Sequence, residues 1–393
     1  MRLLKSGTAL LVTGLVGGAG ISSPTAAVEA RILTDFETLY RDARDEPLRL
    51  RGPDDPDQQL DTRLALELSG QGLYARPEWQ QTGSEAGELS LPEIYYDASA
   101  GALELSIGRK ALQWDYGFSA APVSWLGPPE QQDHYSADPL VLAEYYRGLQ
   151  VWQAGCTVRL EDADELCLVR TEGFTGPADW QLLAGYETGW RLGAGVNWIA
   201  ADRLAIRASA AWAERRKSPA YDPADPETAY QTQDPIRTER GERLEWLLGT
   251  SLSLDSGWEF LLEHAWDSAA LSAEDWRQIM ARVADLTTTP EPQPGARPQN
   301  LGWLAGAAAT RPPVQHRTLL RATQSWNDWS GEGLVTLLWT DDQPTWVSEI
   351  GPSYQWTEQA RLKARWRHYD ADGILADLGN EFRLILEIRT ARR

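Results

Sequence analysis

Cationic side chains stand at every second position in a short stretch near the end of the chain. They are Arg361, Lys363, Arg365 and Arg367. The residues between them include Leu362 and Trp366. Because successive side chains of a β-strand point to opposite faces, a strand here has one cationic and one apolar face. Guanidinium groups form paired hydrogen bonds with carboxylates and phosphates, so the pattern predicts a surface that attracts anions.

The residue types that most enzymes use for catalysis are not arranged for it in this chain. The four histidines, His134, His264, His316 and His368, are scattered without the spacing of metal ligands. No Gly-x-Ser-x-Gly motif, which presents a nucleophilic serine in many hydrolases, occurs in the sequence. We therefore predict that the protein is not an enzyme and has no catalytic residue, no metal site and no cofactor.

Two neighbouring segments show the alternation at the length of a whole strand. Residues 190–198 alternate apolar residues, from Trp190 to Trp198, with Arg191, glycines and a polar residue. Residues 204–212 repeat the pattern after a link that suits a tight turn. A strand that crosses a bilayer in a closed barrel needs about 9–11 residues and carries aromatic residues where the bilayer meets water. A strand of a soluble protein is usually shorter, at about five or six residues.

Composition narrows the class of protein further. The chain has 393 residues, enough for two or three soluble domains or one large barrel, and 19 Trp against 5 Phe. Tryptophan favours the interface between bilayer and water, although a soluble sugar-binding protein is an alternative source of such a composition. The formal net charge of -20 argues against a nucleic-acid partner, since phosphate contacts need a basic surface.

The start of the chain has the features of a secretory signal. Arg2 and Lys5 precede a short apolar run at Ala9–Val16, and small residues follow. The segment after it is polar, with a helix expected near Asp35–Arg44. We therefore predict an exported protein of the cell outer membrane in three parts: a signal peptide at 1–30, a periplasmic N-terminal lead at 31–59 and a transmembrane β-barrel at 60–393.

The number of alternating segments predicts the size of this barrel. We count about 16 strands, with 14 as the alternative because residues 140–170 divide ambiguously. The four longest interruptions follow the first, third, ninth and eleventh of these strands, so all four fall on one side. Long extracellular loops on one side and short periplasmic turns on the other are typical of outer-membrane barrels, which have an even number of strands.

Further arginines occupy polar positions of the expected strands, and we expect all of them to line the pore together with residues 361–367. They are Arg109, Arg191, Arg203, Arg207, Arg243, Arg321 and Arg383. A charge on the lipid-facing side costs about 2–4 kcal/mol near the bilayer midplane, which favours the interior. Two arrangements are consistent with the sequence. The cations either form an electropositive constriction or pair with acidic residues of the interior, namely Glu67, Glu104, Glu245, Glu259, Glu263 and Glu387.

The only two cysteines, Cys156 and Cys167, flank the expected tip of a hairpin. Pairing about that tip places them opposite each other, and exported proteins meet an oxidising compartment. A disulfide and two unpaired small apolar residues are both consistent with the pattern, and we include the disulfide among the predictions.

The longest interruption contains one segment with a helical pattern, Ser272–Leu286. Such a helix either enters the mouth of the barrel and narrows it or lies outside as a surface cap, and the sequence does not decide between the two.

One segment resembles a known family. In residues 93–114 a hairpin leads into Ile107-Gly108-Arg109-Lys110, followed by Trp114 and Gly117. This order resembles a hairpin module of outer-membrane porins of the alginate-export and nutrient-uptake type. The resemblance covers roughly 25 residues and implies a barrel; it does not identify a substrate.

These observations predict a porin-like channel for small or anionic solutes, with acidic saccharides as one candidate class. The alternative is a non-conducting barrel that serves as a structural or assembly partner in surface polysaccharide or lipid traffic. In both cases the expected partners are outer-membrane lipid and the barrel-assembly machinery.

Overall fold

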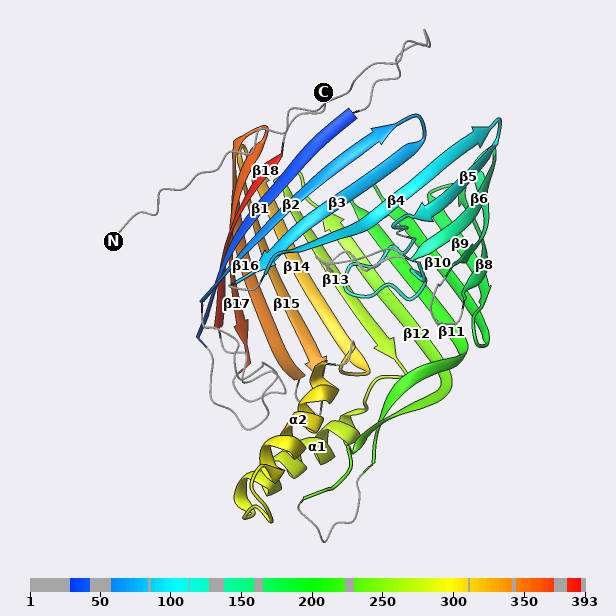
Figure 1. Ribbon diagram of the computed structural model, residues 1–393. Helices are drawn as coiled ribbons and strands as arrows, with labels where there is room; N and C mark the ends of the chain where they lie inside the picture. Colours follow the sequence, from blue (N-terminus) through cyan, green and yellow to red (C-terminus); the bar gives the residue numbers. More distant parts are fainter. Residues whose placement is uncertain are drawn as a thin grey trace.

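Eighteen antiparallel strands form a single closed barrel in the computed structural model of the protein (Figure 1). Each strand pairs with its neighbours in the sequence, and β18 pairs with β1 to close the ring. The structure describes residues 29–42, 58–83, 86–112, 114–126, 138–158, 165–222, 230–309, 312–340, 344–370 and 380–389. The predicted all-β, closed antiparallel barrel is therefore confirmed.

The strands run in chain order around the ring. They are β1 (Glu29–Asp42), β2 (Gln58–Gly70), β3 (Leu73–Thr82), β4 (Glu88–Ala100), β5 (Leu103–Arg109), β6 (Pro139–Arg147), β7 (Gln150–Thr157), β8 (Cys167–Thr175), β9 (Ala178–Tyr186), β10 (Trp190–Ala201), β11 (Leu204–Tyr221), β12 (Ile236–Ser253), β13 (Trp258–Asp267), β14 (His316–Trp326), β15 (Trp329–Trp339), β16 (Pro344–Thr357), β17 (Ala360–Tyr369) and β18 (Asn380–Arg389).

The expected count of about 16 strands, with 14 as the alternative, was wrong, because β1 and β3 were not recognised. The expected division of the chain was wrong for the same reason. Residues 31–42 belong to the barrel and not to a periplasmic lead, and β2 already begins at Gln58. Glu29 and Ala30, at the end of the expected signal peptide, begin β1. Residues 1–28 lie outside the described residues.

Strand β1 also replaces the expected helix near Asp35–Arg44. Its apolar residues Ile32, Phe36 and Tyr40 recur every four residues, a spacing that fits a helix as well as one face of a strand. The backbone of β1 instead pairs with β2 on one side and with β18 on the other. The pairing with β18 joins the two ends of the chain, so no local pattern could reveal it.

Strand β3 was hidden by its polar composition and by Pro77. The pairing registers of β3 with both of its neighbours are interrupted next to this proline. Proline has no N–H to donate to a strand partner, and an irregularity of this kind accommodates it.

The two ends of the barrel differ as expected. Connections that follow even-numbered strands are short turns, such as Gln71–Gly72 between β2 and β3. The long segments follow β1, β5, β11 and β13, all of them odd-numbered strands. The long interruption expected after the strand at residues 60–68 was wrong, because it contains β3. The segment after β13 folds into α1 (Ala273–Thr288) and α2 (Ala296–Ala309), which lie beyond the barrel at the end opposite to the start of β1 and the end of β18 (Figure 1).

The two helices lie outside the mouth of the barrel and share an apolar core with residues at the ends of β11, β12 and β15. Ser272 caps α1 in a capping box with Asp275. Trp276, Ile279 and Leu304 are among the buried residues of the core between α1 and α2. The helical segment is thus a surface cap and does not enter the barrel. No helix within the described ranges has the length and apolar content needed to cross a membrane.

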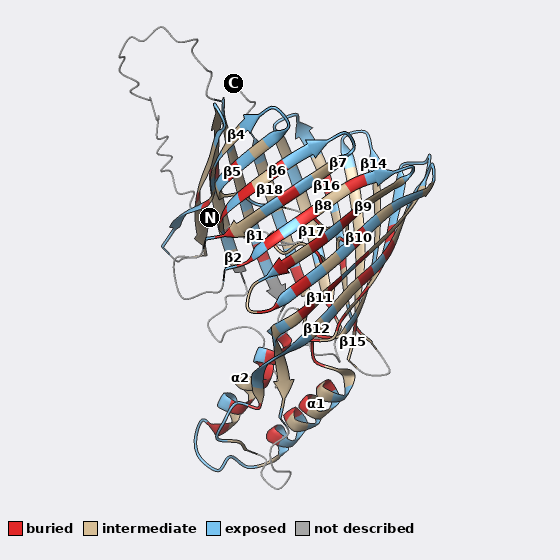
Figure 2. Ribbon diagram, turned by 90° about the vertical axis from the view of Figure 1, so that its right-hand side faces the viewer, coloured by how far each residue is buried: buried red, intermediate tan, exposed pale blue. Residues whose placement is uncertain are grey.

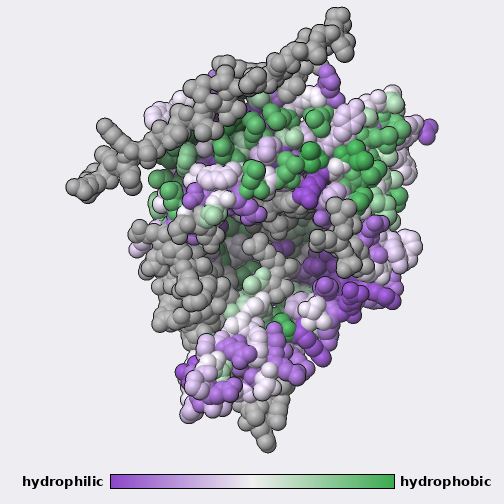
Figure 3. Space-filling view, in the orientation of Figure 1, coloured by the Kyte–Doolittle hydropathy of each residue, from purple (hydrophilic) through white to green (hydrophobic). Residues whose placement is uncertain are grey.

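The outer face of the barrel is apolar. On β10, Trp190, Leu192 and Trp198 are 57%, 51% and 46% exposed, whereas the intervening Arg191 is only 8% exposed. Figure 2 shows the same alternation of exposed and buried residues along the other strands. In Figure 3 apolar residues gather over the part of the barrel nearer the termini, and hydrophilic residues gather toward the helices. An exposed apolar wall of this extent fits the interior of a bilayer.

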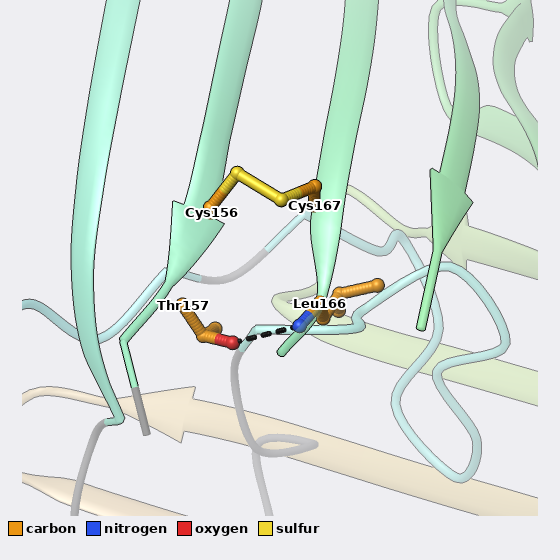
Figure 4. Close-up of a disulfide and its surroundings, with 4 residues drawn as sticks. All are labelled: Cys156, Thr157, Leu166 and Cys167. Carbon is orange, nitrogen blue, oxygen red and sulfur yellow. Dashed lines mark hydrogen bonds between the residues drawn. A yellow bond between two sulfur atoms is a disulfide. The ribbon is translucent and has the colours of Figure 1, made fainter. Parts of the chain in front are cut away.

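The two cysteines form a disulfide between neighbouring strands (Figure 4). Cys156 of β7 lies opposite Cys167 of β8 in the pairing register. Next to the disulfide, the Thr157 hydroxyl accepts a hydrogen bond of 3.0 Å from the backbone N–H of Leu166. The disulfide and this hydrogen bond hold the two strands together where they leave the barrel.

The closure of the ring can be tested with cysteine pairs between β1 and β18. In a background in which Cys156 and Cys167 are replaced by serine, Thr38→Cys and Leu384→Cys are expected to form a disulfide, because these residues are directly opposite. Thr38→Cys with Ile388→Cys is the control, since Ile388 lies opposite Thr34. A four-residue offset separates the control pair by about 13 Å along the strand, too far for a disulfide. Gel mobility with and without reductant is the measurement, and equal cross-linking of both pairs would contradict the register.

Candidate functional site in the barrel interior

The segment after β5 folds back into the barrel and occupies part of its interior. Trp114, Val123 and Leu126 of this segment are buried. They pack against apolar residues on the inner faces of β6, β8, β9 and β11, namely Leu140, Leu142, Leu168, Leu183 and Ala211. We call residues 110–126, of which the structure describes all but residue 113, the inner loop. Apolar side chains on the inner face of a water-filled barrel are unusual, and here the inner loop covers them.

Charged and polar residues of the wall hold the backbone of the inner loop. The carboxylate of Glu263, which is fully buried, accepts hydrogen bonds from the backbone N–H of Phe118 at 2.9 and 3.2 Å and of Ser119 at 2.6 Å. Arg207 donates to the carbonyl oxygen of Tyr116 at 2.8 Å and lies 3.7 Å from the Glu263 carboxylate. Hydrogen bonds to a buried charge are among the stronger ones, at about 1.5–3 kcal/mol each.

Two cations of the wall also lie over aromatic rings of the inner loop. The guanidinium carbon of Arg321 is 4.4 Å from the centre of the Phe118 ring. That of Arg170 is 5.1 Å from the centre of the Trp114 ring. Each contact contributes about 0.5–2 kcal/mol, depending on its exposure to water.

Asp115 organises the turn at the centre of the inner loop. One carboxylate oxygen accepts from the N–H of Tyr116 at 2.7 Å and of Gly117 at 3.2 Å, and the other accepts from Val123 at 2.8 Å. Burial raises the pKa of the Asp115 carboxyl, and these amide donors oppose that effect. Burial likewise raises the pKa of Tyr116 to about 12, so its phenol carries no charge at neutral pH.

Two glycines of β10 leave the space into which the inner loop fits. A Cβ atom at Gly193 would lie 2.9 Å from Val123 and 3.0 Å from the ring of Trp125. A Cβ atom at Gly195 would lie 2.9 Å from the amide nitrogen of Gln181 and 3.4 Å from the ring of Tyr116. The glycines that alternate with apolar residues in β10 therefore serve the close approach of the inner loop.

The space that the inner loop leaves open follows the opposite wall. A first cavity of about 250 Å³ lies beside Phe118 and Arg321. A second, of about 300 Å³, shares Arg321 with the first and extends to Arg361 and Arg365. A third, of about 170 Å³, shares Arg365 with the second and extends to Arg383. Neighbouring cavities thus share lining residues, and together the three follow the wall from β11 to β18 and on to β1–β3.

Only the second cavity has an excess of positive charge among its described lining residues. The first has Arg207 and Arg321 against Asp115 and Glu259. The third has four cations, Arg63, Lys363, Arg365 and Arg383, against four acids, Asp35, Glu37, Asp61 and Glu387. The second has the four cations Arg321, Arg361, Lys363 and Arg365 against Glu332 alone. Positive potential is therefore concentrated in the second cavity, which we call the cationic cavity.

The cations of β17 differ in how far they are neutralised. Lys363 forms an ion pair with Glu387, and Arg367 pairs with Glu349 at 2.6 Å. Arg365 is 3.7 Å from Glu349.

Arg361 has a different set of partners. Its guanidinium donates to the hydroxyls of Ser353 at 2.8 Å and Ser330 at 3.1 Å. Within the described parts of the chain, no carboxylate lies within 4.0 Å of Arg361. Neutral serine partners orient the guanidinium without cancelling its charge.

The structure places most of the predicted pore-lining residues on the inner face. Arg207, Arg321, Arg361, Lys363, Arg365 and Arg383 line the cavities. The remaining ones on this face are Arg191, which pairs with Glu187, Arg243, which pairs with Asp267 and Glu245, and Arg367, which pairs with Glu349. The cavity-lining cations other than Arg361 also lie within 4.0 Å of a carboxylate, so pairing with acids predominates among the described residues of the interior.

Two of the expected pore-lining residues lie elsewhere. Arg109 is opposite Ile94 in the register, and Ile94 is an exposed residue of the outer face. The next residue, Lys110, turns inward and binds Asp97 at 3.0 Å. Arg203 lies in the turn before β11 and pairs with Asp255 of a neighbouring turn, where both side chains are exposed. Arg109 has the same parity as Leu105 and Ile107, so uninterrupted alternation along β5 places it on the outer face, and the expectation that it lines the pore was wrong. Arg203 precedes the first residue of β11, so strand alternation does not set its direction.

Sequence reasoning did not find the inner loop or the residues that hold it. Glu263 was considered only as a partner for arginines, and Ser330 and Ser353 were not considered. The sequence contained one indication of the inner loop: β6 has apolar residues on both faces, such as Val141 and Leu142. A strand that is apolar on both faces needs a cover on each side.

Comparisons with known proteins agree with the fold. No protein-family model matches the chain, and no curated protein matches it. Among solved structures, OccK11 (OpdR) of Pseudomonas aeruginosa aligns with a TM-score of 0.57 and 11% identity over 92% of this chain and 95% of that chain. OccK5 (OpdH) of the same organism gives 0.56 and 11% over 92% and 97%. OpdQ gives 0.55 and 12% over 92% and 98%. The fold is therefore that of outer-membrane porins.

The role of Glu263 in holding the inner loop can be tested with Glu263→Gln. The substitution removes the charge that accepts the backbone bonds of Phe118 and Ser119, so the loop is expected to loosen by about 1.5–3 kcal/mol. The expected result is a larger and noisier single-channel current in planar bilayers. Glu259→Gln is the matched control, because Glu259 lines the first cavity and accepts a hydrogen bond of 3.4 Å from Thr323, and among the described residues it makes no hydrogen bond to the inner loop. Equal currents from the two variants would contradict the role of Glu263.

The fit between β10 and the inner loop gives a second prediction. Gly193→Val suits a strand, yet its side chain would collide with Val123 and Trp125. We expect a loss of about 1–3 kcal/mol in the free energy of unfolding of the detergent-folded protein, measured by urea titration. Gly241→Val is the control, because a Cβ atom there would have no neighbour within 4 Å. If Gly241→Val lowered the free energy of unfolding as much as Gly193→Val, packing against the inner loop would not explain the loss.

Proposed function

We propose that the protein is an outer-membrane channel through which small solutes diffuse, with a preference for anions. The support for a channel is the closed barrel with its apolar outer face and its neighbouring, charged interior cavities. The solved structures that share this fold are outer-membrane porins, which supports the same location and a transport role rather than catalysis. In the described part of the chain, no three His, Cys, Asp or Glu side chains are close enough to hold a metal ion.

The cationic cavity is the observation that carries the anion preference. It concentrates four cations against one carboxylate, while the cavities on either side are balanced in charge. Low-dielectric walls strengthen the field of such groups on a passing ion. The partial pairing of Lys363 and Arg365 with acids weakens their hold on an anion, and weak binding at several sites permits release as well as entry.

The inner loop makes the channel selective by size. It fills the side of the interior next to β6, β8 and β9, so solutes pass along the wall formed by β11 to β18. Cavities of about 170–300 Å³ suit small carboxylates or single sugar acids better than long polysaccharide chains. Acidic saccharides therefore remain a candidate class in the form of short units.

A second candidate function follows from the same inner loop. A barrel with part of its interior filled could serve as a structural or assembly partner in surface polysaccharide or lipid traffic and conduct nothing. Conductance separates the two functions, because only a channel passes ions across a planar bilayer.

The preference for anions can be tested by reversing one charge of the cationic cavity. Arg365→Glu is expected to move the reversal potential under a salt gradient toward cation selectivity, because Arg365 lines both the second and the third cavity. Arg277→Glu is the control, since Arg277 lies exposed on α1, away from the cavities. An unchanged reversal potential in Arg365→Glu would overturn the anion preference, and no current from the unmodified protein would favour the structural role.

A further inference from the structure

Two histidines from distant parts of the sequence meet on the outer face of the barrel. His264 lies near the end of β13, and His316 is the first residue of β14. In the register, His264 is opposite Thr318 and His316 is opposite Trp266, so the two histidines are diagonal neighbours on one face. Nε2 of His264 and Nδ1 of His316 are 3.3 Å apart.

We propose that His264 and His316 form a binding site for a divalent transition-metal ion, such as Zn²⁺, Ni²⁺ or Cu²⁺, at the rim of the barrel that carries the long segments. This site is separate from the interior cavities, so the proposal does not depend on the channel function.

The distance between the two nitrogens suits one metal ion. A Zn²⁺ ion binds imidazole nitrogen at about 2.0–2.1 Å, and a tetrahedral angle at the metal then places two such nitrogens about 3.3–3.4 Å apart. The measured separation of 3.3 Å therefore needs no movement of the backbone to admit a metal. A hydrogen bond between the two rings has a similar separation and is the arrangement that a metal would replace.

A neighbouring hydroxyl orients the first ligand. Nδ1 of His264 lies 2.8 Å from Oγ1 of Thr318, and the same oxygen accepts a hydrogen bond of 3.1 Å from Nε1 of Trp339. When Nδ1 of His264 donates its proton to Thr318, the lone pair of Nε2 points toward His316. Metal-binding histidines commonly make such a hydrogen bond through the other ring nitrogen, which fixes the tautomer and the orientation of the ring.

Aromatic rings hold both histidines in place and leave one side open. The ring of Trp246 is 5.4 Å from that of His264, and the ring of Trp266 is 6.3 Å from that of His316. His316 is exposed and is the first residue of β14, so ions can approach it from the end of the strand. Tryptophan residues gather at the boundary of the bilayer, which places the pair at the wet edge of the membrane rather than within it.

With only two protein ligands, the site has a defined expected affinity and selectivity for metal ions. Because no group of three or more metal-binding side chains occurs among the described residues, water must complete the coordination. A site with two imidazole ligands favours Cu²⁺ over Ni²⁺ and Zn²⁺, following the general order of stability of these ions. A bound ion would join β13 to β14 at the base of the segment that contains α1 and α2.

His368 provides a matched control on the same barrel. Its ring lies among Trp346 and Trp366, at 5.0 and 5.9 Å, in an aromatic setting like that of His264. Its Nδ1 contacts Oδ1 of Asn380 at 2.5 Å instead of a second histidine. Its loss should leave a two-histidine site intact.

The test is titration of the full-length, detergent-folded protein, freed of any affinity tag, with CuCl₂, NiCl₂ and ZnCl₂ in a non-chelating buffer. Isothermal titration calorimetry gives the affinity, and quenching of tryptophan fluorescence by Cu²⁺ gives a second readout from Trp246 and Trp266. We expect binding of one ion per chain in the unmodified protein and in His368→Ala. In His316→Ala and in His264→Ala we expect the dissociation constant to rise by at least about tenfold.

Thr318→Val is expected to weaken binding without abolishing it, since it removes only the hydroxyl that orients His264. A protein that binds none of the three ions would overturn the proposal. The proposal would also be overturned if His316→Ala bound the ions as tightly as the unmodified protein. The same holds if His368→Ala lost as much metal affinity as His316→Ala. Because His316 is exposed, the His316→Ala variant is expected to fold, and its circular dichroism spectrum checks this.

Discussion

The pairing of β1 with β18 is the interaction on which the rest of this structure depends. Inside a bilayer no water is available to bond with backbone N–H and C=O groups, so every strand must have a partner on both sides. Seventeen of the neighbouring pairs join strands that are consecutive in the sequence, and only the β1–β18 pair joins the two ends of the chain. Without it, two apolar strands would have open edges in the membrane, and the interior would not be enclosed.

Closure of the ring also leaves interior space, and the inner loop fills part of it. A ring of this size encloses more space than the side chains of its own wall can fill. The inner loop fills one side of that space by packing apolar residues such as Trp114 against Leu142 and Leu183 of the wall. Its backbone is held by the buried carboxylate of Glu263, because the N–H groups of a loop inside a protein need acceptors as much as those of a strand do.

The interior is thereby divided into two halves of different chemistry. One half is packed and apolar, and the other is open and charged. Within the open half most cations are neutralised by acids on the same or a neighbouring strand, which limits the cost of enclosing so many charges. Arg361 is held by Ser330 and Ser353 instead, so its positive charge acts on the contents of the cavity. An overall acidic chain can in this way have a locally positive passage.

The sequence by itself determined the fold class, the length of most strands and the side on which the long segments lie, because alternation and turn residues are local properties. It also determined which face of β17 is cationic, since Leu362 and Trp366 can only face lipid. It did not determine that β1 is a strand, because the spacing of its apolar residues fits a helix as well and its decisive partner, β18, is at the other end of the chain. Only the tertiary structure decided that Glu263 contacts Phe118, that Arg361 contacts two serines and that His264 contacts His316. These contacts depend on register and on a loop folding inward, and both are set by the closed ring as a whole.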